Sequence, residues 1–306
     1  MLTQLRVGPE RDGGRLDALL RGIEAPGLGP LSRQKARDLC AAGAIAVDGV
    51  RADAAARVRR GQTVTFAAPF AALTLDLGIA VAFADDRVVV LQKPPGLAVH
   101  GGPLVAVSVT DALARALPGA GLAQRLDREA SGLLLIGRDT AALQALGRAM
   151  ERGDVEREYL AIVHGVLIDA HRTIDLPLRV TDEPRGGRPK TVVDPAGQRS
   201  VSHVQVEATR KDATLVRVRL ETGRTHQVRA HLAAIGHPLL GDPRYGDAAA
   251  NAAARATFGT ARTLLHGARL LFPCPATGAR IEVTAMQEPD FVRLFPSLCR
   301  ADQSSP

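Results

Sequence analysis

The chain has 306 residues, which is enough for one large domain or for a small domain and a large one, and we expect two. Hydrophobic residues make up 46% of it, but no apolar stretch approaches the roughly 20 residues of a membrane helix. The first residues, MLTQLRVGPERDGG, lack the apolar core of a signal peptide. The composition therefore argues against a membrane protein and predicts a cytoplasmic one.

The charge and the cysteines restrict the class of protein further. A net charge of +7 and an isoelectric point near 10.0 favour a polyanionic partner, although an arginine-rich, GC-biased proteome would give the same values without nucleic-acid binding. Cys40, Cys274 and Cys299 are too scattered for a disulfide framework or a zinc site. We therefore expect inert thiols.

Residues 13–70 are predicted to form a small α/β module. RLDALLRGI (15–23) and LSRQKARDLCAAG (31–43) have helical spacing, with Ser32 as the expected N-cap of the second helix. IAVDGVRA (45–52) alternates around a turn at Asp48 and Gly49, and VRRGQTVTF follows as a closing strand. Between residues 15 and 60, nine Lys or Arg stand against five Asp or Glu. More than half of the excess positive charge therefore lies in this module.

After a predicted linker at 71–80, residues 81–298 are expected to form the larger domain. Apolar and alternating runs predict strands near 87, 133, 159, 201, 213 and 280, and helical spacing predicts helices at about 108–117, 140–152, 225–235 and 289–299. Strands and helices do not alternate regularly, so we predict an α+β fold with a large mixed, mainly antiparallel sheet. Residues 299–306 are expected to be a disordered tail.

The run QRLDREASGLLL at 124–135 places Asp127 on a loop before a buried strand. Ser131 and Gly132 interrupt the backbone pattern just after the acid, and the apolar run 133–136 follows. Arg125 precedes Asp127 by two residues. Such a setting suits a positioned, charged carboxylate, and the alternative is an ordinary surface or capping acid.

A second run, LETGRTHQVRAHLAAIGHPLLGDPRYG at 220–246, carries Arg224 and Tyr245 on either side of a predicted helix with Thr225 as its expected N-cap. Together with LQKPPGLAVHGG (91–102) and REYLAIVHG (157–165), these runs resemble the motif set of the RluA-type pseudouridine synthases, which isomerise uridine in RNA. The N-terminal module resembles the S-four-like RNA-binding domain, for which an ordinary basic α/β cap is the alternative.

This resemblance implies the pseudouridine synthase fold and a set of catalytic residues. Asp127 would attack C1′ of the ribose or take the C2′ proton, and Arg224 would form an ion pair that keeps the carboxylate ionised. Tyr159 would stack on the uracil and assist the loss of the C5 proton. A half-buried strand tyrosine is the alternative for Tyr159.

The resemblance also implies residues that contact RNA. Arg125 would fill the place of the flipped uridine, or else be a phosphate-binding surface arginine, and Leu265 would pack on the target base, or else be plain core. Arg229 would be a further phosphate contact. From the N-terminal module, the expected contacts are Arg33, Lys35, Arg37 and Arg51.

The isomerisation involves no net redox change and no hydrolysis, so the resemblance implies no cofactor and no metal, and a monomer is expected. His226, His231 and His237 do not have the HExxH spacing of a helical zinc site, which argues against a metal site there. The run GGRPKT (186–191) lacks the spacing of a phosphate loop, and we expect a basic loop near RNA.

Two positions depart from the family pattern, which usually has His and Thr where this chain has Gln124 and Ala130. The N-terminal module and the insert DAAANAAARATFG (247–259) make the chain most similar to synthases that act on large-subunit ribosomal RNA. A synthase acting on tRNA, or a non-catalytic RNA-binding ribosome assembly factor on the same scaffold, are the alternatives.

Overall fold

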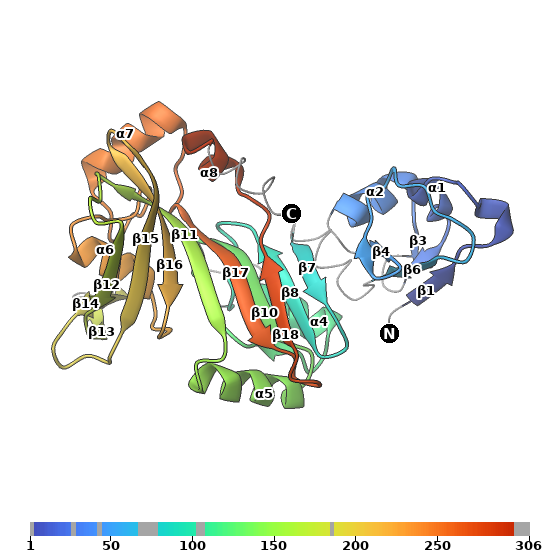
Figure 1. Ribbon diagram of the computed structural model, residues 1–306, viewed down its shortest axis with the longest axis horizontal. Coiled ribbons are helices and arrows are strands. Elements are labelled where there is room, and N and C mark those ends of the chain that lie inside the picture. The colour runs from blue at the N-terminus through green and yellow to red at the C-terminus, as the bar shows by residue number, and fades with distance from the viewer. Residues whose placement is uncertain are drawn as a thin grey trace. The chain divides into compact units, whose positions relative to one another are not determined.

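The computed structural model describes residues 3–25, 29–41, 45–66, 79–101, 108–183 and 187–296 (Figure 1). The chain divides into two compact units. Unit 1 comprises Met1–Arg125, Leu134–Gly147 and Cys274–Gly278, and unit 2 comprises Leu126–Leu133, Arg148–Pro273 and Ala279–Pro306. The boundaries 13–70 and 81–298 stay predictions. Most of the predicted linker at 71–80 and all of the predicted tail at 299–306 lie outside the described residues.

The N-terminal part of unit 1 contains a four-stranded antiparallel sheet in the order β1-β6-β4-β5. Its strands and helices are β1 (Thr3–Arg6), η1 (Pro9–Arg11), α1 (Leu16–Leu19), β2 (Glu24–Ala25), β3 (Gly29–Pro30), α2 (Arg33–Ala41), β4 (Ile45–Val47), β5 (Val50–Arg51) and β6 (Thr63–Phe66). One cluster of buried residues drawn only from positions 7 to 64 packs between these elements. This part of the chain therefore has a hydrophobic core of its own.

Two local predictions for this part are confirmed, the N-cap at Ser32 and the turn at Asp48 and Gly49. The Lys35 N–H donates to the Ser32 hydroxyl at 3.1 Å, which is the predicted N-cap of α2. Asp48 and Gly49 have φ angles of 49° and 79°, as a type I′ hairpin turn between β4 and β5 requires. The first predicted helix is shorter than expected, because α1 covers four residues only.

The rest of unit 1 is built on buried strands. β10 (Ser131–Gly137), which is buried along its whole length, continues from unit 2 and carries β8 (Val88–Lys93) and then β7 (Ala80–Ala84) on one side, and it also pairs with β9 (Gly121–Leu122). The helices are α4 (Val109–Ala116) and α5 (Thr140–Glu151), both close to their predicted positions. The apolar runs at 88–91 and 133–136 are continuous because a strand with both faces covered needs no polar alternation.

Unit 2 contains strands in the order β12-β15-β16-β11-β17-β10, with β18 on β17. All pairs are antiparallel except β10 with β17, where Ser131 and Gly132 lie opposite His266 and Gly267 in parallel. The strands are β11 (Glu156–His164), β12 (His171–Asp175), β15 (Val201–Arg210), β16 (Ala213–Leu220), β17 (Leu265–Pro273) and β18 (Arg280–Thr284). A large mixed, mainly antiparallel sheet was predicted, and this α+β architecture is confirmed.

The remaining elements of unit 2 are a separate hairpin of β13 (Leu178–Glu183) and β14 (Gly187–Val193), and the helices α6 (Gln227–Ala234), α7 (Ala248–Phe258) and α8 (Pro289–Leu294) (Figure 1). Residues of α7, α8 and strands β11, β16 and β17 form one hydrophobic core. In the described chain, no helix is both long and apolar enough to span a bilayer.

Two segments differ from the sequence analysis. The run GGRPKT was expected to be a loop, but residues 187–193 form β14, in which Thr191 pairs with Val180. Pro189 is tolerated because the two-stranded sheet leaves one edge of β14 without a ladder partner. The insert at 247–259 had no predicted structure and forms α7, with the Asp247 side chain accepting from the Ala250 N–H at 2.7 Å.

Candidate active site

Asp127 lies on a short turn that leads into β10. The Ala130 N–H donates to the Asp127 carbonyl at 3.2 Å and closes the turn, and Ala130 is completely buried. Two residues later, Gly132 has a φ of 111° and lies against Gly267, where a Cβ would collide with the backbone. Only glycine fits this position. The loop therefore enters the sheet in one fixed geometry, with the Asp127 side chain 22% exposed.

The carboxylate of Asp127 is held by Arg229 of α6. Arg229 Nη1 donates to Asp127 Oδ2 at 3.0 Å, and the same guanidinium donates through Nε and Nη2 to Asp242 at 2.6 and 2.9 Å. The Arg229 side chain is 4% exposed, and that of Asp242 is completely buried. One arginine thus bridges two carboxylates, of which only Asp127 reaches solvent.

Asp242 binds Arg229 through both of its carboxylate oxygens. Burial by itself would raise the pKa of its carboxyl, but the Arg229 guanidinium and the N–H groups of Arg244 and Tyr245 lower that pKa below its ordinary value. Burial likewise disfavours the charged form of Arg229, and the two carboxylates reverse this and raise its pKa. Arg229 and Asp242 are therefore both ionised, although they are buried.

These contacts correct two predictions from the motif. Arg224 was expected to pair with Asp127, but it lies three residues before α6, is exposed, and donates through Nε to the Arg199 carbonyl at 3.3 Å. Arg229 was expected to contact a phosphate, but its buried guanidinium is taken up by the two acids. The motif match assigned the ion pair to Arg224, whereas Arg229 forms it. The helix start also differs, because α6 begins at Gln227, with His226 rather than Thr225 at the N-cap position.

A second set of polar groups lies near the other carboxylate oxygen of Asp127, Oδ1. His226 Nε2 is 3.9 Å from Asp127 Oδ1, and His226 Nδ1 is 3.0 Å from the Tyr245 hydroxyl. That hydroxyl accepts the Thr191 N–H at 2.9 Å, and the Arg229 guanidinium lies 4.9 Å from the Tyr245 ring centre. Burial lowers the pKa of His226; the charge of Asp127 opposes this and raises it, and the charges of Arg229 and Arg244 lower it further, so that the pKa lies below its ordinary value.

Tyr159 and Leu265 share one face of the sheet beside this site. Tyr159 on β11 lies opposite Gly267 of β17, and Leu265 lies opposite Ala161, so both side chains point to the same side. Both residues are buried, with 8% and 4% exposed. Burial raises the pKa of Tyr159, and the charge of Asp127 raises it further. The hydroxyl of Tyr159 is thus within the electrostatic reach of Asp127.

A buried polar cluster supports the strand after Asp127. The Ser131 hydroxyl is 2.9 Å from His266 Nδ1 on β17, and Arg262 forms ion pairs with Glu288 at 3.1 Å and with Asp290 at 2.7 Å. Burial and the charge of Arg262 lower the pKa of His266 to about 4. His266 is therefore neutral at pH 7.

The other predicted RNA contacts are Arg125, two residues before Asp127, and four basic residues of the N-terminal module. Arg125 is exposed. In α2, Lys35 is exposed, whereas Arg33 and Arg37 donate to the buried carboxylate of Asp17 and keep 48% and 47% of their side chains exposed. Arg51 belongs to β5, and its side chain lies outside the described residues.

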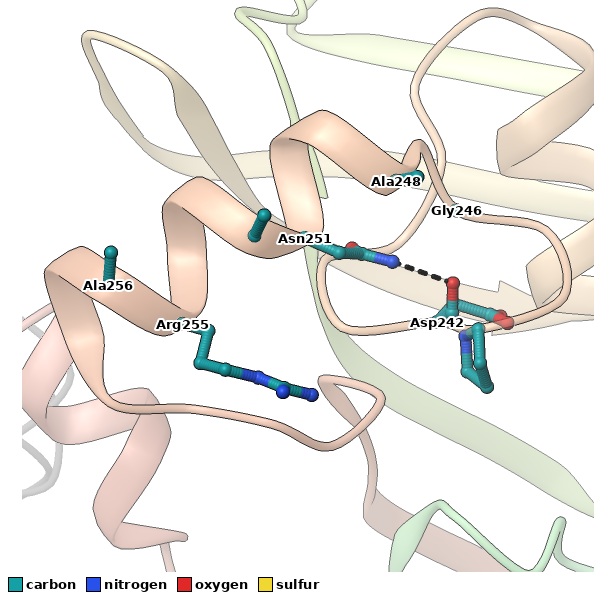
Figure 2. Close-up of a pocket in the computed structure, with 8 residues that line it drawn as sticks. Asp242, Gly246, Ala248, Asn251, Arg255 and Ala256 are labelled. Atoms are coloured by element: carbon teal, nitrogen blue, oxygen red, sulfur yellow. Dashed lines mark hydrogen bonds between the residues drawn. The ribbon is translucent and has the colours of Figure 1, made fainter.

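Helix α7 holds the turn that carries Asp242. The Asn251 side chain donates to the Asp242 carbonyl at 2.8 Å and accepts from the Gly241 N–H at 2.7 Å (Figure 2). Beside it lies a cavity of about 510 Å³ lined by Asp242, Pro243, Gly246, Ala248, Asn251, Ala252, Arg255 and Ala256. Asp127 does not line this cavity, and α7 contacts the turn at residues 241 and 242 through the two hydrogen bonds of Asn251.

Sequence reasoning missed three members of the site. Asp242 and Thr191 were not selected, and His226 was considered only as a metal ligand. No three His, Cys, Asp or Glu residues gather as a metal site within the described ranges. The run GDPRYG after the predicted helix held a usable signal, because an acid followed by Pro and Gly indicates a tight turn whose side chain bonds its own backbone.

A partly exposed carboxylate held by a buried arginine at the end of a mixed sheet is a geometry that suits an enzyme with a positioned acid. The family model described as RNA pseudouridylate synthase matches residues 87–234. The chain is 33% identical over 319 residues to the ribosomal large subunit pseudouridine synthase D of Xanthomonas campestris pv. campestris, covering 97% of this chain and 92% of that protein. It is 34% identical to the protein of the same name from Vibrio cholerae serotype O1, over 87% of each chain.

The chain therefore belongs to the RNA pseudouridylate synthase family, and the predictions of an RluA-type member and of an RNA pseudouridine synthase enzyme are confirmed. A solved structure agrees in fold. Human RNA pseudouridylate synthase domain containing 4 superposes with a TM-score of 0.59 and 23% identity, covering 72% of this chain and 92% of that chain.

Proposed function

We propose that this enzyme converts uridine to pseudouridine in large-subunit ribosomal RNA, with Asp127 as the reacting carboxylate. Support for the substrate comes from the relatives named as ribosomal large subunit pseudouridine synthases, which align along most of the chain. The observation that carries the role of Asp127 is its contact with the buried Arg229, because this pair holds one partly exposed carboxylate in a fixed direction.

The reaction is an isomerisation, so its atoms balance without a second substrate. The N1–C1′ bond breaks, the uracil turns, C5 joins C1′, and the proton on C5 is lost while N1 gains one. Asp127 either attacks C1′ or takes the proton from C2′. In both routes the carboxylate must already be ionised and aimed at the ribose, and the Arg229 guanidinium on Oδ2 favours both.

We assign the remaining roles from the positions of the side chains. Tyr159 would stack on the detached uracil and Leu265 would pack beside it, since both project from the same sheet face. Arg125 would occupy the place of the flipped nucleotide. Arg224 is exposed and does not pair with Asp127, so we assign it to the binding of an RNA phosphate.

The N-terminal module is proposed to bind RNA through α2. Arg15, Arg33 and Arg37 surround the single carboxylate of Asp17, which leaves an excess of positive charge on a half-exposed surface. Lys35 adds a further exposed cation on the same helix. We further propose that the protein acts in the cytoplasm on ribosomal RNA, as its relatives' names suggest, and that it acts as a monomer.

Tritium release from a large-subunit ribosomal RNA transcript labelled at C5 of uridine tests the reaction directly. Wild type should release tritium, and Asp127→Asn should release none while binding the transcript with unchanged affinity. Glu129→Gln, in the same loop, is the matched control and should retain full release. Equal release by wild type and Asp127→Asn would disprove the role of Asp127. Binding without any release by wild type would support an RNA-binding assembly factor, and release from tRNA alone would change the substrate.

A further inference from the structure

His226 occupies the second side of the reacting carboxylate. Arg229 binds Oδ2 of Asp127, and His226 Nε2 faces the other oxygen, Oδ1, at 3.9 Å. His226 adopts a left-handed backbone conformation, with a φ of 54°. Residues other than glycine rarely adopt this conformation, and when they do, the strain is often found at functional sites. The ring is thus held against Asp127 at some cost in backbone strain.

The hydrogen bonds of the Tyr245 hydroxyl bear on which nitrogen of the His226 ring carries the proton. The Thr191 backbone N–H can only donate, so the Tyr245 oxygen accepts from it at 2.9 Å. Tyr245 has one hydroxyl proton to donate, and its remaining neighbours are His226 Nδ1 at 3.0 Å and the Thr191 side chain. A nitrogen that accepts this proton carries none of its own. In a neutral imidazole, the proton is then on Nε2, the atom that faces Asp127.

The two other protonation states of the His226 ring, the opposite tautomer and the charged imidazolium, fit the neighbouring charges less well. The opposite tautomer would turn the Nε2 lone pair toward the Asp127 carboxylate, which is repulsive. A charged imidazolium would be attracted by Asp127 and Asp242, but it would be partly buried and close to the cations of Arg229 and Arg244. Burial and these two arginines lower the pKa of His226, so the ring is neutral at pH 7.

We propose that His226 is a positioning residue that presents an Nε2–H to Asp127 Oδ1, with its tautomer set by Tyr245. This inference rests on the proposed role of Asp127 in pseudouridine formation. At 3.9 Å the contact is longer than a hydrogen bond, so the Nε2–H acts on Oδ1 as a nearby dipole that favours the ionised carboxylate. Arg229 and His226 thus each act on a different oxygen of the carboxylate, which restricts its rotation.

Two substitutions test the roles of the two ring nitrogens of His226 one at a time. In His226→Gln, the amide nitrogen lies as many bonds from Cα as Nε2, so a donor toward Asp127 is kept. In His226→Asn, the amide oxygen takes the place of Nδ1 and can still accept from Tyr245, but nothing reaches Asp127. Asn also adopts the left-handed conformation more readily than most residues, so this variant should fold. Tyr245→Phe removes the group that sets the tautomer.

Single-turnover pseudouridine formation on the large-subunit ribosomal RNA transcript measures the effect. We expect His226→Asn to lower the rate roughly tenfold or more with unchanged RNA affinity, and His226→Gln to stay within about threefold of wild type. A purely structural role would lower protein stability and affinity as well. A rate for His226→Asn equal to that of wild type overturns the inference and leaves the role of Asp127 intact.

Nitrogen-15 NMR of the histidine rings in the full chain gives a readout that needs no substrate. Wild type at pH 7 should show the neutral Nε2–H form at His226, assigned by its loss in His226→Asn, and Tyr245→Phe should give a mixture of tautomers. Asp127→Asn should shift the Nε2 signal. An Nδ1–H or doubly protonated ring in wild type overturns the inference. If wild type forms no pseudouridine, the proposed function fails, and the spectrum alone decides the state of His226.

Discussion

Replacing Arg229 by methionine should expose how the two carboxylates depend on one guanidinium. Methionine fills a similar length but donates no hydrogen bond, so the contacts at 3.0 Å to Asp127 and at 2.6 and 2.9 Å to Asp242 are all lost. Asp127 keeps access to water, with 22% of its side chain exposed, whereas Asp242 has none. The substitution therefore leaves an ionised and fully buried Asp242 with only two backbone N–H donors.

Removing one partner of a buried ion pair costs about 3 to 5 kcal/mol in the free energy of unfolding, because the other charge remains buried. We expect Arg229→Met to lose this amount. The double variant Arg229→Met/Asp242→Asn removes the stranded charge, and its amide oxygen still accepts from the N–H groups of Arg244 and Tyr245. It should recover at least about 2 kcal/mol of the loss, a coupling typical of residues in direct contact.

Urea unfolding at pH 7 measures the stability of wild type, both single variants and the double variant, and tritium release measures activity. The double variant should be stable but nearly inactive, because Asp127 has lost its donor. The reasoning is refuted if Arg229→Met loses less than about 1 kcal/mol, or if the double variant is no more stable than Arg229→Met. Restored activity in the double variant would show that Asp127 does not need the arginine.

Three further outcomes are expected. Gly132→Ala should destabilise the protein by more than about 3 kcal/mol, since its Cβ meets the Gly267 backbone at a φ of 111°, whereas Gly147→Ala in α5 meets nothing and should be neutral or stabilising in thermal melts. The pKa of His266 is about 4 in the folded chain against an ordinary 6.5, so only the unfolded chain binds this proton between those values. The contribution of His266 to the free energy of unfolding is therefore present above pH 6.5, and it should fall by up to about 2 kcal/mol between pH 7 and pH 5. An equal fall in the His266→Asn variant would contradict this assignment. Deleting residues 1–66 should flatten the salt dependence of RNA binding, where the log-log slope is about −0.7 to −0.9 per neutralised phosphate, and an unchanged slope would exclude the module from binding.

The sequence alone determined the elements whose signals are local. The apolar run 133–136 identified a fully buried strand, and Ser32 identified the start of α2, because a cap bonds to an N–H only three residues away. The turn at Asp48 and Gly49 follows from the left-handed conformation that both residues tolerate. The position of Asp127 between a polar run and a buried strand also follows from adjacent residues.

Only the tertiary structure decided which residues act on Asp127. Arg224 and Arg229 belong to the same motif, and the packing of α6 brings the second of them to a carboxylate 102 residues earlier in the chain. Asp242 and His226 were likewise selected by packing, because ion pairs and proton chains depend on distances in space. Local sequence patterns report propensity over a few residues, so they cannot choose between two arginines five positions apart.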